Sequence, residues 1–416
     1  MTRFGLHLQI LTGLVLGGAV GFFLTDWAGY VSWIGDLFLR ALQMLIVPLV
    51  VTSIASGVIS IARTGELGRL GLKTLAYYAT TSLLAAGLGL TLVNVIAPGR
   101  GAGLGFSATV DGLDEARASF GSILTETIPQ NIFAALAENE MLPVLFVAFV
   151  FGYTVTRLEH EHRDLLTDFV SVGFALMMKM TLFVIRLAPL GVFAIIAGVV
   201  ARQAGDLEAL TSVVERLGLF AITVFLGLAL HAGGTLALLL RAARIPPLRH
   251  ARAMMTPLLT AFSTASSSAT LPLTLEKVEK DAGVSNKVTS FVLPLGATVN
   301  MDGTALYECV AAIFIAQAYG VELSLVQQVV IVATALLVSV GAAGIPMAGL
   351  VMMSVVLTAV GLPLEGIGLV LAVEWILGMT RTVVNVWSDS CGAVMIARSE
   401  GEQLAYDEPW LATVKG

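Results

Sequence analysis

Four long stretches of the sequence contain no charged side chain, and they restrict the chain to folds that are solvated by lipid. A helix needs about 20 predominantly apolar residues to cross the hydrocarbon of a bilayer. Only 12% of the 416 residues are charged, whereas soluble proteins carry about 25%. We therefore expect an all-α membrane protein with several spans. The uncharged stretches, each of 18 residues or more, are Leu8–Thr25, Ala41–Ala62, Thr74–Pro98 and Leu217–Leu240.

Composition argues against several other classes of protein. The net charge of −6 gives no reason to expect a nucleic-acid partner. Cys309 and Cys391 lie in apolar segments, so we interpret them as packing residues and not as a disulfide or a metal site. The sequence shows no glycine-rich phosphate loop, metal-ligand spacing or nucleophile–base motif, and an intramembrane enzyme is a poor fit. The first span lacks a small-residue cleavage site, and we expect it to be retained.

Charged residues between the apolar stretches predict the orientation in the membrane. Cationic residues cluster in two loops, at 63–73 and 241–252. By the positive-inside rule these loops are cytoplasmic. This orientation in the cell membrane places both termini on the cytoplasmic side and the loop after Pro98 on the outer side. Lys179 and Arg186 lie seven residues apart in an apolar segment, and we interpret them as interfacial cations. The outer loop carries Asp111, Asp114 and Glu115 against Arg100 and Arg117.

Two uncharged segments are interrupted by residues that disfavour a helix. Segment 323–364 has 42 uncharged residues, too many for one span, and its centre reads VGAAGIPMAG. Segment 253–275 is broken by STASSSATLP. Irregular backbone at membrane depth survives only where it is buried in protein or lines a wet cavity. Two re-entrant hairpins would therefore indicate a transporter or a channel; the alternative for each segment is two tightly joined ordinary spans.

A polar stripe runs through the apolar segment 366–397. Its members follow helical spacings of 4, 3, 4 and 4, so they share one face of a helix. Each ionisable residue within a bilayer costs at least about 2.5 kcal/mol, so the stripe predicts a polar interior surface. Arg381 is its only cation, and its planar guanidinium suits a carboxylate. The alternative is an internal ion pair of Arg381 with Glu374 or Asp389. The stripe consists of Glu374, Gly378, Arg381, Asn385 and Asp389.

The segment LPLGATVNMDGTALYE, at 293–308, contains a second polar group. Its polar residues at 300–304 would point all round a regular helix, so we expect the helix to unwind there and expose carbonyl groups. Carbonyl and carboxylate oxygens suit a hard cation such as Na⁺, and we assign Asp302 and Asp389 to cations. The alternative role for Asp302 is to cap a broken helix. Glu308 is either a proton carrier or a permanently paired or protonated side chain.

Three consecutive serines, at 266–268, stand in the first interrupted segment. Their hydroxyl groups and backbone N–H groups could bind an anion. The alternative is that the hydroxyls bond back to helix carbonyls. Taken alone, the serines are weak evidence for a site.

These motifs, together with YYATTS at 77–82, resemble the glutamate transporter family, the dicarboxylate/amino acid:cation symporters. The matching pieces are SSSATLP, LPLGATVNMDGTALYE, SVGAAGIPMAGL and RTVVN followed by Asp389. The residues in these motifs are similar to those of the animal excitatory amino acid transporters. The resemblance implies eight transmembrane helices and two re-entrant hairpins, in a homotrimer surrounded by lipid. A static scaffold would comprise 1–70 and 99–205. An elevator-type transport domain would comprise 71–98 and 206–416, with hairpins at about 252–279 and 323–364.

The resemblance also implies the substrate site. Arg381 would bind the distal carboxylate of a small anionic substrate, with Thr382 close by and Gly378 beside it. Glu308 matches the position associated with proton transport in the animal members. The residues implied for the main carboxylate and backbone of the substrate are Ser266, Ser268, Thr304, Gly344 and Asn385.

Co-transported Na⁺, in about three sites of oxygen ligands, is the implied coupling ion, and H⁺ is a further option. The first site would join the Asp389 carboxylate to backbone oxygens of Gly296, Asn300 and Asn385. The second would use Thr298 with carbonyls of Ser339, Val340 and Ala342. The third would use Tyr78, Thr81, Ser82, Asn300 and Asp302.

Departures from the family pattern bear on the substrate and on ion coupling. At the position of Gly378, family members that transport amino acids have an Asp, and this Asp pairs with the ammonium of the substrate. Family members that transport dicarboxylates lack this Asp. The family's second arginine is missing at both of its usual positions, Met379 and Ala265, which puts potassium counter-transport in doubt. Met347 replaces Gln or Gly in the second hairpin.

We therefore expect a Na⁺-coupled symporter for a dicarboxylate without an amine, such as malate, succinate or fumarate. The alternative is an acidic amino acid transporter for glutamate or aspartate, in which Glu374 or backbone carbonyls receive the ammonium. A passive anion channel is a third class, and uptake against a gradient would exclude it.

Overall fold

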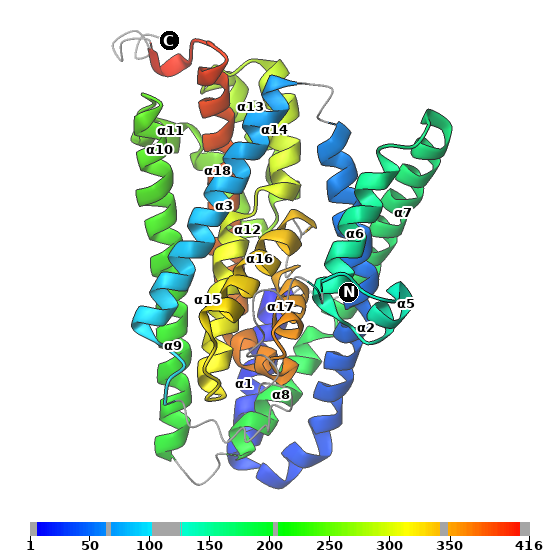
Figure 1. Ribbon diagram of the computed structural model, residues 1–416. Coiled ribbons are helices and arrows are strands. Elements are labelled where there is room, and N and C mark those ends of the chain that lie inside the picture. Colours follow the sequence, from blue (N-terminus) through cyan, green and yellow to red (C-terminus); the bar gives the residue numbers. More distant parts are fainter. Residues whose placement is uncertain are drawn as a thin grey trace.

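The computed structural model describes residues 6–63, 68–101, 125, 127–202, 207–341 and 348–407, and every regular element in these ranges is helical (Figure 1). Six helical segments are long and apolar enough to cross a membrane. Shorter apolar helices, such as Met141–Val155 and Gly349–Ala359, accompany them. The expectation of an all-α membrane protein is thus confirmed. The six segments are Thr25–Ser60, Arg69–Ile96, His160–Ile185, Thr211–Ala242, Asn286–Ala318 and Leu364–Ser399.

One packed group is built around the long helix α2, which contacts α6, α7 and α8. Helix α1 lies along α8, and a Cβ added at Gly13, Gly17 or Gly21 of α1 would collide with the α8 backbone. Small residues at every fourth position let two helices approach closely in a membrane. The group comprises α1 (Leu6–Phe23), α2 (Thr25–Arg63), α5 (Ile132–Ala137), α6 (Met141–Val155), α7 (His160–Ile185) and α8 (Ala188–Arg202).

The second packed group surrounds α15, whose residues 302–316 are all buried. Most of its side chains are apolar or small, and its polar residues Asp302, Thr304 and Glu308 are buried with them, so α15 is a helix enclosed by protein on all sides. Helices α3 and α18 pack directly on it. The group comprises α3 (Arg69–Ile96), α9 (Leu207–Leu230), the π-helix η3 (His231–Leu236), α10 (Ala237–Ala242), α14 (Asn286–Val299), α15 (Asp302–Ala318) and α18 (Ile367–Ser399).

Both interrupted segments fold back on themselves. Helix α12 (Met255–Thr264) packs against α13 (Ser267–Lys280), and α16 (Leu325–Gly341) packs against α17 (Ala348–Ala359). Ala265, with φ of 48°, turns the chain between α12 and α13. Two short helical hairpins are therefore present, and the tip of the second, 342–347, lies outside the described residues.

Short elements complete the end of the molecule that carries α13, α14 and the C-terminus in Figure 1. They are α11 (Pro247–Ala253) and the 3₁₀ turn η5 (Ala405–Asp407), while the turn η4 (Leu364–Gly366) precedes α18. Both cysteines are buried and unpaired, as the sequence predicts.

Candidate functional site

The α14–α15 helix breaks where the sequence predicts it. Asn300 and Met301 are non-helical, with ψ of 81° and 58°, and α15 resumes at Asp302. All three residues are buried. Gly303 is required here, because a Cβ would collide with the backbone oxygen of Arg381 on α18. The break therefore brings a row of polar groups into the interior, against α3 and α18.

Asp302 lies at the centre of this row and has four hydrogen-bonding partners. Its Oδ1 accepts from Ser82 Oγ at 2.6 Å and Thr81 Oγ1 at 3.2 Å. Its Oδ2 accepts from Ser388 Oγ at 2.6 Å and lies 2.9 Å from His231 Nε2. The carboxylate is fully enclosed, and its partners come from α3, η3 and α18. The capping role considered for Asp302 is not seen, since no side-chain cap of α15 is formed.

Asp389 forms a second carboxylate position beside the first. Asn300 Nδ2 donates to Asp389 Oδ1 at 2.9 Å and also to Ser388 Oγ at 3.0 Å. A Cβ at Gly296 would overlap Asp389 Oδ1 and the Tyr78 hydroxyl, so this glycine permits their close approach. Tyr78 itself donates to the Val292 carbonyl at 2.6 Å.

The two expected ion-ligand groups that contain Asp389 and Asp302 are therefore brought together, joined through Asn300. Buried carboxylate, amide and hydroxyl oxygens form a donor set that suits a hard monovalent cation. Tyr78 lies nearer Asp389 than the expected third site implies, since its hydroxyl adjoins the Gly296 position and bonds to α14.

The remaining expected ion group is described only in part. Thr298 Oγ1 donates to the Leu295 carbonyl at 3.1 Å, and Ser339 Oγ donates to the Leu336 carbonyl at 2.8 Å. Ala342 and the side chain of Val340 lie outside the described residues, as do Gly344 and Met347. These assignments remain predictions.

Arg381 lies in the middle of the polar stripe and is buried, at 5% exposure. Its Nη2 donates to Glu374 Oε1 at 3.1 Å, and its guanidinium lies over the Tyr307 ring, 4.7 Å from the centroid. Arg381 Nη1 and Glu374 Oε2 have no hydrogen-bond partner among the described residues. The pair considered as an alternative does form, but it leaves one donor and one acceptor unused in a dry environment, where unpaired polar groups are costly.

Two glycines flank this pair. A Cβ at Gly349 of α17 would overlap the guanidinium. Among the described residues, a Cβ at Gly378 would meet only Arg381 Nη2 and Glu374 Oε1, both at 3.7 Å, which is ordinary contact. The described part of the chain therefore leaves room for one added carbon atom next to the ion pair at Gly378.

Asn385 joins the stripe to the start of α15. Its Oδ1 accepts from the Gly303 N–H at 2.8 Å, and its Nδ2 donates to Thr304 Oγ1 at 3.2 Å. Thr382, by contrast, bonds back to the Gly378 carbonyl at 2.8 Å. Glu308 is buried at 1% exposure, and both of its carboxylate oxygens lack a hydrogen-bond partner in the described part of the chain.

The serines of the first hairpin are divided in role. Ser266 is the N-cap of α13, and its hydroxyl accepts from the Ala269 N–H at 3.1 Å. This contact differs from the bond back to a helix carbonyl that the sequence analysis gave as the alternative to an anion site. Ser268 is exposed. Their expected contact with substrate stays a prediction.

Two contributors to the site escaped the sequence analysis, His231 and Ser388. Both bond directly to Asp302 Oδ2. A usable signal existed for each: His231 is the single ionisable residue in the window 217–240, and such residues in spans are often functional. Ser388 precedes Asp389 and lies almost on the polar stripe.

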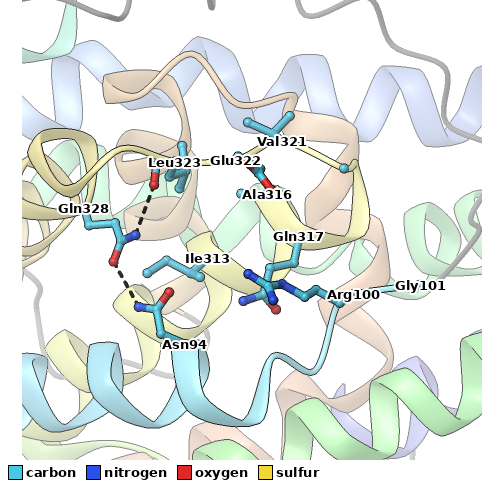
Figure 2. Close-up of a pocket in the computed structure, with 11 residues that line it drawn as sticks. Asn94, Arg100, Gly101, Ile313, Ala316, Gln317, Val321, Glu322, Leu323 and Gln328 are labelled. Carbon is cyan, nitrogen blue, oxygen red and sulfur yellow. Dashed lines mark hydrogen bonds between the residues drawn. The ribbon is translucent and has the colours of Figure 1, made fainter.

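A cavity of about 540 Å³ lies elsewhere, between the end of α3 and the start of α16 (Figure 2). Asn94 donates to Gln328 at 2.9 Å, and Gln328 donates to the Leu323 carbonyl at 3.1 Å. Neither carboxylate of the buried row lines this cavity, so we place the chemistry in the polar interior and not here.

Comparisons with known proteins identify the family of the chain. The chain is 37% identical to the proton/glutamate-aspartate symporter of Escherichia coli (strain K12), over 96% of this chain and 93% of that protein. It is 36% identical to excitatory amino acid transporter 4 of Mus musculus, over 91% and 79%, and 34% identical to the proton/sodium-glutamate symport protein of Bacillus caldotenax, over 97% and 96%. The model of the sodium:dicarboxylate symporter family matches residues 6–399. The chain therefore belongs to the sodium:dicarboxylate symporter family, and it is a multi-pass membrane transporter and not an enzyme.

Proposed function

We propose that this transporter is a Na⁺-coupled symporter of acidic amino acids, with L-aspartate and L-glutamate as its substrates. The observation that carries the proposal is the buried Arg381–Glu374 pair beside the open position at Gly378. The names of the similar proteins favour an acidic amino acid over the dicarboxylate that the sequence analysis put first.

The pair offers complementary groups for such a substrate. Arg381 Nη1 is an unused donor that can bind the distal carboxylate of the substrate, and a guanidinium can bind a carboxylate through two parallel bonds. Glu374 Oε2 is an unused acceptor that can receive the ammonium. Gly378 leaves the space in which the ammonium can reach it. Thr304 and Asn385, with Ser266, Ser268 and Gly344 of the hairpin tips, complete the proposed site.

Cations would enter the two carboxylate positions. In our proposal one Na⁺ binds at Asp389 with Asn300, Gly296 and Asn385, and another at Asp302 with Thr81 and Ser82. A third Na⁺ would bind at Thr298 with the carbonyl of Ser339. Glu308 remains a candidate proton carrier, because it is buried without a partner among the described residues.

The two packed groups support a division of labour. We assign α1, α2 and α5–α8 to a static scaffold and the group around α15, with both hairpins, to a transport domain that moves as an elevator. Eight spans with cytoplasmic termini, two re-entrant hairpins and a homotrimeric assembly complete this proposal. Discontinuous helices whose ends lie near the membrane midplane are a known way to build transporter sites.

A second candidate function is favoured by one observation. Gly378 supplies no carboxylate where amino-acid carriers of the family have one, so a dicarboxylate such as malate would leave no ammonium unpaired. An ammonium without an anionic partner in a dry site would be expensive.

Glu374→Gln separates the two candidates. It keeps the shape and a hydrogen-bond acceptor but removes the negative charge. If Glu374 receives an ammonium, the concentration of L-aspartate that half-inhibits uptake rises at least tenfold in this variant, which corresponds to about 1.4 kcal/mol. The concentration of malate that half-inhibits uptake does not rise. Glu322→Gln, at an exposed position, is the matched control. Equal losses for both ligands, or malate transport without aspartate transport in the wild-type protein, would favour the dicarboxylate carrier.

A further inference from the structure

The partners of Asp302 differ in what they can do when a cation arrives. Ser82, Thr81 and Ser388 contact the carboxylate through hydroxyl groups. A hydroxyl has one donor and two lone pairs, so it can rotate from donating to the carboxylate to ligating a cation. An imidazole that donates from Nε2 has no lone pair on that atom. His231 is therefore the one partner that stays a donor whether or not a cation is bound.

The surroundings of the His231 ring hold it in that role. The side chain is fully buried, and Nδ1 has no hydrogen-bond partner among the described residues. A neutral ring with its proton on Nε2 satisfies this arrangement, because a proton on Nδ1 would be a buried unpaired donor. The ring thus uses only one nitrogen, and that nitrogen faces Asp302 Oδ2 at 2.9 Å.

The backbone at His231 is specialised as well. The α-helix α9 ends at Leu230, and the next six residues form the π-helix η3 before α10 begins. Such π segments are rare, and they often occur at functional sites. The Ala232 carbonyl accepts from Trp387 Nε1 of α18 at 3.2 Å, which fixes η3 against the helix that carries Ser388 and Asp389.

We propose that His231 is the positioning residue of the Asp302 cation site. By holding Oδ2, it leaves Oδ1 to face the cation together with Thr81 and Ser82, and it keeps the carboxylate in this orientation through the transport cycle. The inference rests on the proposed Na⁺ coupling. Partners that orient a ligand carboxylate change metal affinity by about 10- to 100-fold when they are removed.

The test measures Na⁺ binding without transport. Thermal unfolding of the purified full-length protein in detergent is followed against Na⁺ concentration, without substrate, for the wild type and three variants. His231→Leu removes the donor, and His231→Asn keeps polarity but is too short to reach Asp302. Both should raise the Na⁺ concentration for half-maximal stabilisation 10- to 100-fold. His231→Gln can place its amide N–H near the Nε2 position and should recover to within about threefold of the wild type, well inside the 10- to 100-fold loss.

A role in packing alone predicts another pattern. It lowers the melting temperature without Na⁺ in each variant but leaves the half-saturating Na⁺ concentration unchanged, and that result would overturn the inference. Equal shifts for Gln, Asn and Leu would overturn it as well. If His231→Leu does not fold, the comparison of Asn with Gln decides. If Na⁺ does not stabilise the wild type at all, the proposed coupling fails first, and the role of His231 falls with it.

Discussion

At the scale of single residues, Arg381 is the group on which substrate binding depends in our proposal. Its guanidinium contacts Glu374 and the Tyr307 ring, and a Cβ at Gly349 would overlap it. A cation buried in this way costs several kcal/mol unless it is paired. Arg381 Nη1 has no hydrogen-bond partner among the described residues, and in our proposal it binds the substrate.

Arg381→Ala should abolish uptake of acidic substrates, because it removes both hydrogen-bond donors and leaves Glu374 buried and unpaired. Arg381→Lys should retain a small fraction of the wild-type uptake, since an ammonium supplies the positive charge without the planar set of N–H donors of a guanidinium. Initial rates of labelled L-aspartate uptake, normalised to the folded protein in the membrane, measure both effects. Unchanged uptake by the alanine variant would sink the assignment of Arg381.

Gly378→Asp tests the open position beside the pair. The added Cβ has ordinary contacts of 3.7 Å, so the substitution should be tolerated. A second carboxylate next to Glu374 increases the affinity of the site for an ammonium and repels a dianion. The affinity for aspartate relative to malate, measured by inhibition of uptake, should therefore rise at least tenfold, or about 1.4 kcal/mol. Gly378→Ser is the uncharged control. A ratio that rises equally for serine would show that bulk, and not charge, sets the preference.

At the scale of elements, the C-terminal segment forms a clasp, defined here as residues 400–407, over the ends of four helices. Glu400 bonds to Arg69 and Lys73 of α3, at 3.0 and 2.6 Å, and Glu402 bonds to Ser285 before α14 at 2.5 Å. The hydrogen bonds from Arg69, and then from Lys73, lower the pKa of the Glu400 carboxyl to about 2. This carboxylate therefore stays charged at any pH in ordinary use.

His250 makes the stability of the clasp depend on pH. Its ring lies between Tyr406 of the clasp, at 2.8 Å, and Ser390 of α18, at 3.1 Å. Burial lowers the pKa of His250 from 6.5 to about 3. In the unfolded chain the ring takes up a proton below pH 6.5, while in the fold it stays neutral to about pH 3. Stability is thus full above pH 6.5 and falls as the pH drops toward 3, by about 2 kcal/mol at pH 5.

Melting temperatures of the purified protein at pH 7 and pH 5 measure this loss. We expect a decrease for the wild type that is smaller in His250→Gln, whose side chain does not titrate. The difference between the two proteins isolates His250 from the carboxylates that titrate in the same range. An equal decrease in both would contradict the role of His250.

The elements also show what a sequence can and cannot predict. The break at Asn300 was predictable because the polar residues within 300–304 would point all round a regular helix. The fold-back at Ala265 followed from the run STASSSATLP. The π-helix at His231 was not predictable, because HAGGTL lies inside a continuous uncharged span and carries no sequence signal for a π-helix. Likewise the Arg381–Glu374 pair was one of two pairings that the spacing allowed, and packing against α15 decided between them.

At the scale of the whole molecule, two packed groups of helices lie against each other, and the second group holds one polar interior row. Its carboxylates, hydroxyls and amides come from α3, α14, α15, η3 and α18, and one cation, Arg381, faces them from the same stripe. Ion and substrate positions in the proposal therefore share Asn385 and the start of α15, so that binding of one rearranges the ligands of the other. That shared scaffold is the physical basis we propose for coupling.

Uptake into proteoliposomes tests this coupling most directly. An inward Na⁺ gradient is imposed, and accumulation of labelled L-aspartate is compared with that of labelled malate. The account predicts that aspartate is concentrated above its external level, that the accumulation disappears when K⁺ replaces Na⁺, and that Asp302→Asn abolishes it. Aspartate that only equilibrates, or that enters equally without Na⁺, would contradict the account.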